Sequence, residues 1–108
     1  MELSEARGPV LRRTIVVVDG DIQARICAAD QLRAAGFRVL EARDGGEASV
    51  LLMAYSDVDL VVTDLQSSGS SNGLAISQWL AREQPHIPVL HGAQNLVDRV
   101  AAVWNSGT

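Results

Sequence analysis

The sequence predicts an α/β fold with a mostly parallel sheet, and two features of the chain indicate it. Short, continuous apolar segments rich in β-branched residues are typical of parallel strands that are covered on both faces. They alternate along the chain with longer segments whose apolar residues recur at helical spacing. Because each crossover returns over the sheet with right-handed sense, this alternation predicts a doubly wound sheet with helices on both faces.

The first predicted strand and helix open a domain of residues 14–108, which follows an N-terminal extension of residues 1–13 that has no sustained period. The strand is the apolar run at 14–18. Asp21 is a favoured N-cap residue for the helix that follows, and Gly36 is a favoured residue for its end. The apolar residues of this helix, which predict its buried face, are Ile22, Ile26, Ala29, Leu32 and Ala35.

Three further strand and helix pairs follow in the remaining sequence. The predicted strands are residues 37–42, 60–63 and 87–90. The helix after the second strand carries Ala48, Leu51, Leu52 and Tyr55, the next runs from Gly73 to before Pro85, and the last carries Leu96, Val97, Val100, Val103 and Trp104.

Composition limits the classes of function. The chain has 108 residues, of which 47% are hydrophobic, and this suffices for one buried core. A formal charge of -4 without a long basic run argues against direct nucleic-acid binding. The absence of a long apolar run or a signal peptide predicts a cytoplasmic protein without a membrane partner. The single cysteine, Cys27, falls in the helical apolar pattern and is expected to be buried.

Acidic residues follow the first and third predicted strands. Asp19 and Asp64 close two strands of one parallel sheet, at the edge where ligands bind in such folds, and Asp21 can join them. Gathered carboxylates repel one another unless a cation compensates, and Mg²⁺ prefers carboxylate and carbonyl oxygens. An Asp in such a place can also attack a phosphoryl group. The pattern is equally compatible with aspartates that only cap helices and end strands.

Five segments together resemble the receiver family of response regulators. They are TIVVVDGD at 14–21, EARDGGEA at 41–48, DLVVTDL at 59–65, NGL at 72–74 and IPVL at 87–90. The resemblance implies a flavodoxin-like sheet with four strands in the order 2-1-3-4. It also implies that Asp64 accepts a phosphoryl group from a histidine kinase or phosphotransfer protein, and that Mg²⁺ is held by Asp19, Asp21, Asp64 and the backbone carbonyl of Gln66.

The sequence departs from the family pattern at several positions. Gly20 stands where the family has a second acidic residue, which predicts weak Mg²⁺ binding. Ala93 stands at the position of the switch Ser or Thr and has no hydroxyl, and nearby His91 is expected to be a bystander. The fifth strand, its Lys and the final helix are missing, which predicts an exposed edge at the fourth strand and self-association, such as a homodimer, or a dedicated partner.

Three hypotheses follow for the function. The first is a single-domain receiver that is phosphorylated at Asp64 and signals by binding a partner in a phosphorelay. The second is a phosphorylation-independent pseudo-receiver, a protein interaction module that keeps the fold without the switch. The third, a small metal-dependent hydrolase, rests on fold analogy alone. We therefore expect a signalling module rather than an enzyme.

Overall fold

A computed structural model describes residues 12–63 and 71–105 of the chain. In this part, four strands form one parallel sheet in the order β2-β1-β3-β4. The strands are β1 (Thr14–Val18), β2 (Arg38–Ala42), β3 (Val58–Thr63) and β4 (Val89–His91). The helices are α2 (Ile22–Ala34), α3 (Gly45–Ala54), α4 (Ser71–Glu83) and α5 (Leu96–Asn105). The predicted fold class and strand order are confirmed.

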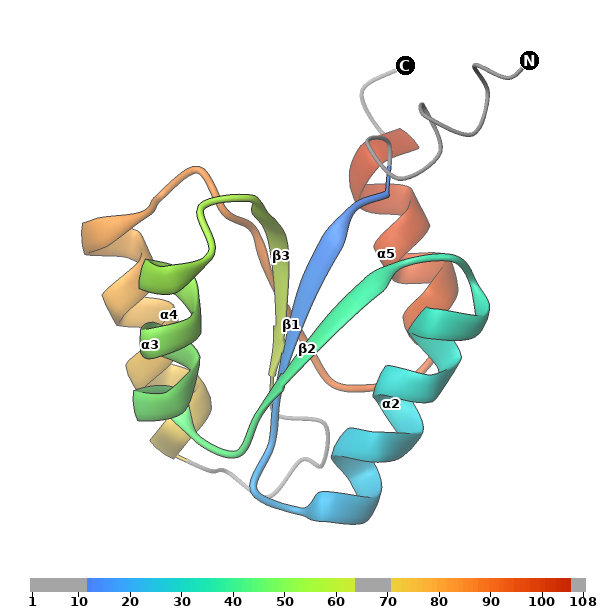
Figure 1. Ribbon diagram of the computed structural model, residues 1–108, viewed down its shortest axis with the longest axis horizontal. Coiled ribbons are helices and arrows are strands. Elements are labelled where there is room, and N and C mark those ends of the chain that lie inside the picture. The colour runs from blue at the N-terminus through green and yellow to red at the C-terminus, as the bar shows by residue number, and fades with distance from the viewer. Residues whose placement is uncertain (1–11, 64–70, 106–108) are drawn as a thin grey trace.

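Helices cover both faces of the sheet, with α2 and α5 on one side and α3 and α4 on the other (Figure 1). Because side chains alternate along a strand, β1 supplies both layers. Ile15 and Val17 face α2 and α5, whereas Val16 and Val18 face α3 and α4. Full burial of such a side chain stabilises the fold by about 1.5–3 kcal/mol, so β1 anchors both layers of the core.

Two hydrophobic clusters result, one on each face of the sheet. The α2–α5 core consists of Ile15, Val17, Ala28, Ala29, Leu32, Val39, Leu60, Val62, Leu96 and Val100. The α3–α4 core consists of Val16, Val18, Ala42, Ala48, Leu52, Val58, Val61, Ile76, Leu80 and Ile87.

The ends of α2 are formed as the sequence predicts. The Asp21 Oδ1 atom accepts a hydrogen bond from the Ala24 N–H at 2.9 Å, which caps the first turn. After the helix, Gly36 has a φ of 101°, a left-handed conformation that favours glycine. The chain then turns directly into β2.

The predicted buried face of α2 is wrong at its first turns and at Ala35, which is exposed. The side chains of Ile22 and Ile26 are 59% and 43% exposed, and Cys27 is also exposed. The Gln31 Nε2 atom lies 3.4 Å from the Cys27 Sγ atom on this outer surface. Arg25 lies toward the sheet instead, because its guanidinium reaches groups at the end of β1 and on β2.

The strand bounds also differ from those predicted. β3 begins at Val58, and the register between β1 and β3 shifts between Thr14 and Ile15. The Asp59 carboxylate accepts the Thr14 N–H at 2.9 Å at this irregularity. β4 begins at Val89, because the Ile87 N–H is taken by the Gln84 carbonyl in a turn.

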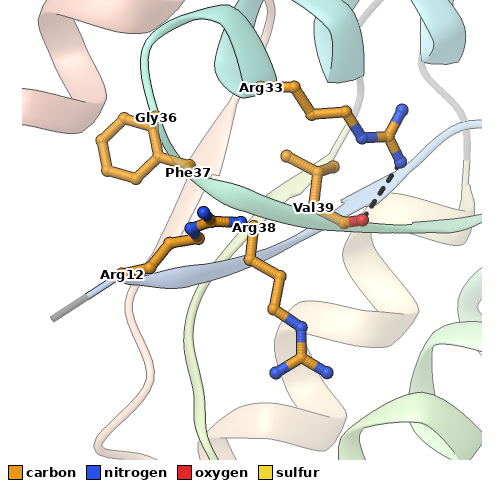
Figure 2. A pocket seen from close by; sticks show the side chains of 6 residues that line it. All are labelled: Arg12, Arg33, Gly36, Phe37, Arg38 and Val39. Carbon is orange, nitrogen blue, oxygen red and sulfur yellow. Dashed lines mark hydrogen bonds between the residues drawn. The ribbon is translucent and has the colours of Figure 1, made fainter. Parts of the chain in front are cut away.

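β2 lies at one edge of the sheet, and side chains cover part of that edge. The Arg33 Nη2 atom donates to the Val39 carbonyl at 3.1 Å (Figure 2). The Glu47 Oε1 atom accepts the Arg43 N–H at 2.8 Å at the end of the strand. Such side-chain caps protect an edge strand from pairing with another chain.

Candidate functional site

The carboxyl ends of β1, β3 and β4 lie side by side. Val18 is the partner of Thr63 in the β1–β3 pair, and Thr63 is the partner of His91 in the β3–β4 pair. Asp19 directly follows β1, and its N–H donates to the Ala42 carbonyl at 3.0 Å. This is the edge at which parallel α/β sheets bind ligands. The predicted Asp64 and Gln66 lie outside the described residues.

The carboxylates of Asp19 and Asp21 shape the turn between β1 and α2. The Asp19 Oδ1 atom accepts the Asp21 N–H at 2.7 Å, and Asp21 in turn caps α2. A carboxylate has about four acceptor positions, so each of these groups can accept more than the amide contact described here. Within residues 12–63 and 71–105, no group of three or more His, Cys, Asp or Glu side chains is placed to hold a metal ion. The carboxylate oxygens of these two aspartates are nevertheless hard ligands of the kind that Mg²⁺ prefers.

Gly20, between the two aspartates, is not required by the backbone. The residue is exposed, and a Cβ atom there would lie 3.5 Å from the Arg43 carbonyl oxygen, an ordinary van der Waals contact. Its φ does not lie in the left-handed region, since the positive φ values among the described glycines belong to Gly36 and Gly92. The position therefore has room for an acidic side chain.

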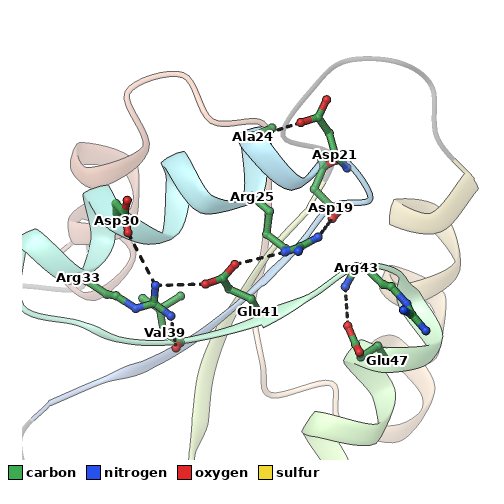
Figure 3. Close-up of polar contacts among 10 residues, drawn as sticks. All are labelled: Asp19, Asp21, Ala24, Arg25, Asp30, Arg33, Val39, Glu41, Arg43 and Glu47. Carbon is green, nitrogen blue, oxygen red and sulfur yellow. Dashed lines mark hydrogen bonds and ion pairs between the residues drawn. The ribbon is translucent and has the colours of Figure 1, made fainter.

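Arg25 joins α2 to the carboxyl end of β1 and to β2 (Figure 3). Its Nη1 atom donates to the Asp19 carbonyl at 2.8 Å, and its Nε atom lies 3.3 Å from the Glu41 Oε1 atom. The Arg33 Nη1 atom lies 3.1 Å from the other Glu41 oxygen. Hydrogen bonds to charged groups are stronger than neutral ones, so Arg25 fixes the position from which the Asp19 side chain leaves the sheet.

The loop between β4 and α5 contains the predicted switch position. Its Gly92 N–H donates to the Thr63 carbonyl at 2.9 Å, so the loop adjoins the end of β3. Gly92 and Asn95 have φ values of 85° and 53°, which bend the chain sharply on either side of Ala93. Ala93 is half-buried and packs against the α2–α5 core. It has no hydroxyl with which to contact a phosphoryl oxygen.

Arg99 of α5 holds this loop through three of its carbonyl groups. The Nη1 atom donates to the carbonyl oxygens of Gly92 at 3.0 Å and Gln94 at 3.1 Å. The Nη2 atom donates to the His91 carbonyl oxygen at 2.6 Å. One guanidinium, with its five N–H donors in a planar fork, therefore fixes the backbone of the loop from both ends.

Sequence reasoning missed both arginines as structural residues of the site. A signal was available, because each shares a helix stripe with buried residues. Arg25 precedes Ala28 and Ala29 by one helical turn, and Arg99 lies between Leu96 and Val100. A long side chain on such a stripe can bury its stem and carry its charged group to the sheet edge.

The comparisons with known proteins identify the family. The model of the response regulator receiver domain matches residues 15–104. The chain belongs to the response regulator receiver family.

This receiver is 34% identical over 88 residues to the aerobic respiration control protein ArcA of Escherichia coli strain K12, and equally to that of strain O6:H1. The match covers 80% of the receiver and 36% of ArcA, so the chain spans about a third of the length of these relatives. The chemotaxis response regulator CheY4 of Vibrio cholerae superimposes with a TM-score of 0.64 at 22% identity. The superposition covers 74% of the receiver and 67% of CheY4, and it confirms the flavodoxin-like fold.

Family membership assigns the receiver to two-component signalling and, in general terms, to phosphorelay signal transduction. None of the helices in the described part of the chain is long and apolar enough to span a bilayer.

Proposed function

We propose that the receiver accepts a phosphoryl group at Asp64 from a histidine kinase or phosphotransfer protein and signals by binding a partner. The observation that carries the proposal is the register of the sheet. It aligns Val18, the residue before Asp19, with Thr63, the residue before Asp64 in the sequence. Since the carboxyl ends of parallel strands meet at one edge, both acids follow strands that end at the same place.

For phosphoryl transfer, the protein mainly has to position the carboxylate of Asp64, the metal ion and the phosphoryl donor. A carboxylate oxygen of Asp64 would form the new bond to phosphorus, while the bond from phosphorus to the donor breaks and the donor keeps the electron pair. Asp19 and Asp21, with Asp64 and the backbone carbonyl of Gln66, would hold a Mg²⁺ ion that neutralises charge on the transferred group. Arg25 would keep the turn that carries Asp19 and Asp21 in place through the Asp19 carbonyl.

The direct test is the intact mass of the protein after incubation with Mg²⁺ and acetyl phosphate. We expect one phosphate adduct on the wild type and on Asp57→Asn, a control that removes an exposed aspartate elsewhere. Asp64→Asn should give no adduct, because an amide is not a comparable nucleophile. An unmodified wild type under conditions that modify an ordinary receiver would contradict the proposal.

The second candidate is a pseudo-receiver whose interactions do not depend on phosphorylation. Ala93 and the Arg99 contacts favour it, since the loop lacks a hydroxyl and is already held by three carbonyl hydrogen bonds. In this case a phosphoryl group would have no side-chain hydroxyl in the loop to attract.

Hydrogen exchange separates the two candidates without a known partner. A phosphorylated receiver with a working switch should change the exchange rates of the amides at 91–95. A pseudo-receiver should show the same rates in these amides with and without acetyl phosphate and Mg²⁺. The Asp64→Asn variant gives the baseline for any effect of the reagents alone.

A further inference from the structure

A pocket lies at the other end of the sheet from Asp19, beside the amino ends of β1 and β2 (Figure 2). Its volume is about 390 Å³, within the range of about 300–1,000 Å³ that small-molecule sites occupy. It is lined by Arg12, Arg33, Gly36, Phe37, Arg38 and Val39. Three of these residues are arginines and none is acidic, although the chain as a whole has a formal charge of -4.

The turn from α2 into β2 keeps the pocket open. Gly36 bends the chain with its φ of 101°, and a Cβ atom there would find nothing within 4 Å. Phe37 is fixed beside it, because its ring packs on that of Trp104 with 5.8 Å between the ring centroids. Arg13 lies 4.4 Å from the centroid of the same Trp104 ring. The wall of the pocket is therefore ordered by packing rather than by a ligand.

Arg33 brings incompletely compensated positive charge to the pocket. Its guanidinium is fixed by the Val39 carbonyl and by Glu41. The Glu41 carboxylate also pairs with Arg25, so one negative charge faces two guanidinium groups. The other acid near Arg33 is Asp30, which is 70% exposed and 3.8 Å away, and such a pair contributes little.

Arg12 adds a second cation. Among the described residues it has no hydrogen-bond or ion-pair partner, and it is exposed. Figure 2 shows the Arg33 side chain ending at the Val39 carbonyl, whereas the Arg38 guanidinium points away from it across β2. There Arg38 pairs with Asp57 at 3.2 Å and lies over the Tyr55 ring. The two guanidinium groups available to a ligand are those of Arg12 and Arg33.

The backbone of β2 supplies a third donor. In this parallel pair the Arg38 N–H donates to Arg13 and the Ala42 carbonyl accepts from Asp19. Backbone groups alternate along a strand, so the Val39 N–H points away from β1, toward the edge of the sheet. Within the described part of the chain this N–H has no acceptor, although Val39 is only 7% exposed. An N–H at a sheet edge can donate to water or to a ligand oxygen.

We propose that this pocket binds the phosphate group of a small metabolite through Arg12, Arg33 and the Val39 N–H. Two guanidinium groups and an amide that line one pocket suit a dianion whose oxygens accept several charged hydrogen bonds. Addition of a peptide strand fits less well, because Arg33 already occupies the Val39 carbonyl that such a strand would need. The site is separate from the phosphoacceptor end of the receiver.

The test is a titration of the full chain with inorganic phosphate in the presence of EDTA, at constant ionic strength, followed by amide and arginine side-chain NMR signals. We expect saturable shifts of the Val39 amide and of the Arg12 and Arg33 Nε signals. Arg12→Gln should weaken phosphate binding about ten-fold, the effect of losing one charged hydrogen bond.

The matched control is Arg82→Gln, which removes the same charge from an exposed position on α4, on the other face of the sheet. It should leave the affinity within about two-fold of the wild type, since exposed charges beyond a Debye length are screened. A linear, non-saturating shift of the Val39 amide would overturn the proposal. Equal weakening of phosphate binding by Arg12→Gln and Arg82→Gln would also overturn it. So would saturable shifts of the Asp21 amide in place of the Val39 amide. Acetate carries one negative charge, and if it bound as strongly as phosphate the proposal would be wrong.

Discussion

Gly20 separates two aspartates at the end of β1, at a position where the resemblance to the receiver family led us to expect a further acidic side chain. The structure has space there, since a Cβ atom would meet only the Arg43 carbonyl at 3.5 Å. We expect Gly20→Asp to raise the affinity for Mg²⁺ about ten-fold or more, because a charged ligand contributes roughly 1.5–3 kcal/mol. Isothermal titration calorimetry with MgCl₂ measures this.

Gly20→Ala is the control, because it adds the Cβ atom without the charge. Its Mg²⁺ affinity should equal that of the wild type. If both variants change the affinity alike, the backbone of the turn decides the affinity, and a carboxylate at position 20 does not act as a metal ligand.

Arg99 holds the loop between β4 and α5 through backbone carbonyl groups. Arg99→Gln removes the donors to the carbonyl groups of His91, Gly92 and Gln94. The free energy of unfolding should fall by about 1–2 kcal/mol, because three carbonyl groups, of which that of Gly92 is partly buried, lose a charged donor. The amides of the β4–α5 loop should also exchange faster. Urea denaturation and hydrogen exchange measure the two effects.

Arg82→Gln again serves as the control, since its side chain is exposed on α4. Its free energy of unfolding should stay within about 0.5 kcal/mol of the wild type. Unchanged exchange in the loop of Arg99→Gln would show that the left-handed residues Gly92 and Asn95 hold the loop without the guanidinium.

Local rules predicted some residues well and others poorly. Asp21 and Gly36 were identified from the sequence, because capping and left-handed turns depend on the residue itself. The exposure of Cys27 was not, because helical spacing cannot tell which stripe of α2 faces the sheet. Arg25 orients α2 through its contacts with the Asp19 backbone carbonyl and the Glu41 side chain on β2. Neither contact can be read from the apolar pattern of the helix.

Neighbouring residues of α3 lie in opposite environments. Leu52 is 1% exposed in the α3–α4 core, whereas Met53 is 66% exposed. Leu52→Ala should lower the free energy of unfolding by about 2–5 kcal/mol, because it removes buried methyl groups and leaves a cavity. Met53→Ala should change it by less than about 0.5 kcal/mol. Equal effects in urea denaturation would contradict the packing of α3 described above.

All four strands and four helices of the described residues were predicted from the sequence, because short β-branched apolar runs and longer segments with helical apolar spacing distinguish strands from helices. Strand ends were less accurate. β3 starts earlier because Val58 pairs beside the irregularity at Asp59, and β4 starts later because Ile87 belongs to a turn. These bounds depend on hydrogen bonds between segments, which hydrophobic periodicity does not contain.

The candidate site was predicted only in part. The sheet topology brings Asp19 and the end of β3 to one edge, as expected for a parallel sheet. The roles of Asp64 and Gln66 stay predictions. The Arg99 contacts could not be inferred, because they join α5 to a loop whose shape is set by two positive φ angles.

The strands at the two edges of the described sheet differ in length and in the side chains that bond to their outer backbone groups. β2 has five residues, and Arg33 and Glu47 occupy part of its outer edge. β4 has three residues, and Arg99 occupies the His91 carbonyl. Both edges are thus partly protected against pairing with another chain.

We nevertheless predict weak self-association through β4, because Val89 and Leu90 are only partly buried at that edge. The mean mass from size-exclusion chromatography with light scattering should rise with concentration. Arg99→Gln, which removes the guanidinium donor to the His91 carbonyl at this edge, should strengthen the association. A constant monomer mass over a wide concentration range for both proteins would rule out this interface.

The division of the core by the sheet gives the receiver two built-in optical probes. Trp79 packs against the α3–α4 core and Trp104 against the α2–α5 core, so each indole senses the solvent exposure of one layer. With Trp104→Phe or Trp79→Phe, the remaining fluorescence reports one side of the sheet alone. Because β1 is buried in both layers, both variants should show fluorescence transitions that coincide with the loss of circular dichroism in the same variant. A difference between the two signals would mean that one layer can melt while the other persists, which would allow a partner to remodel half of the receiver.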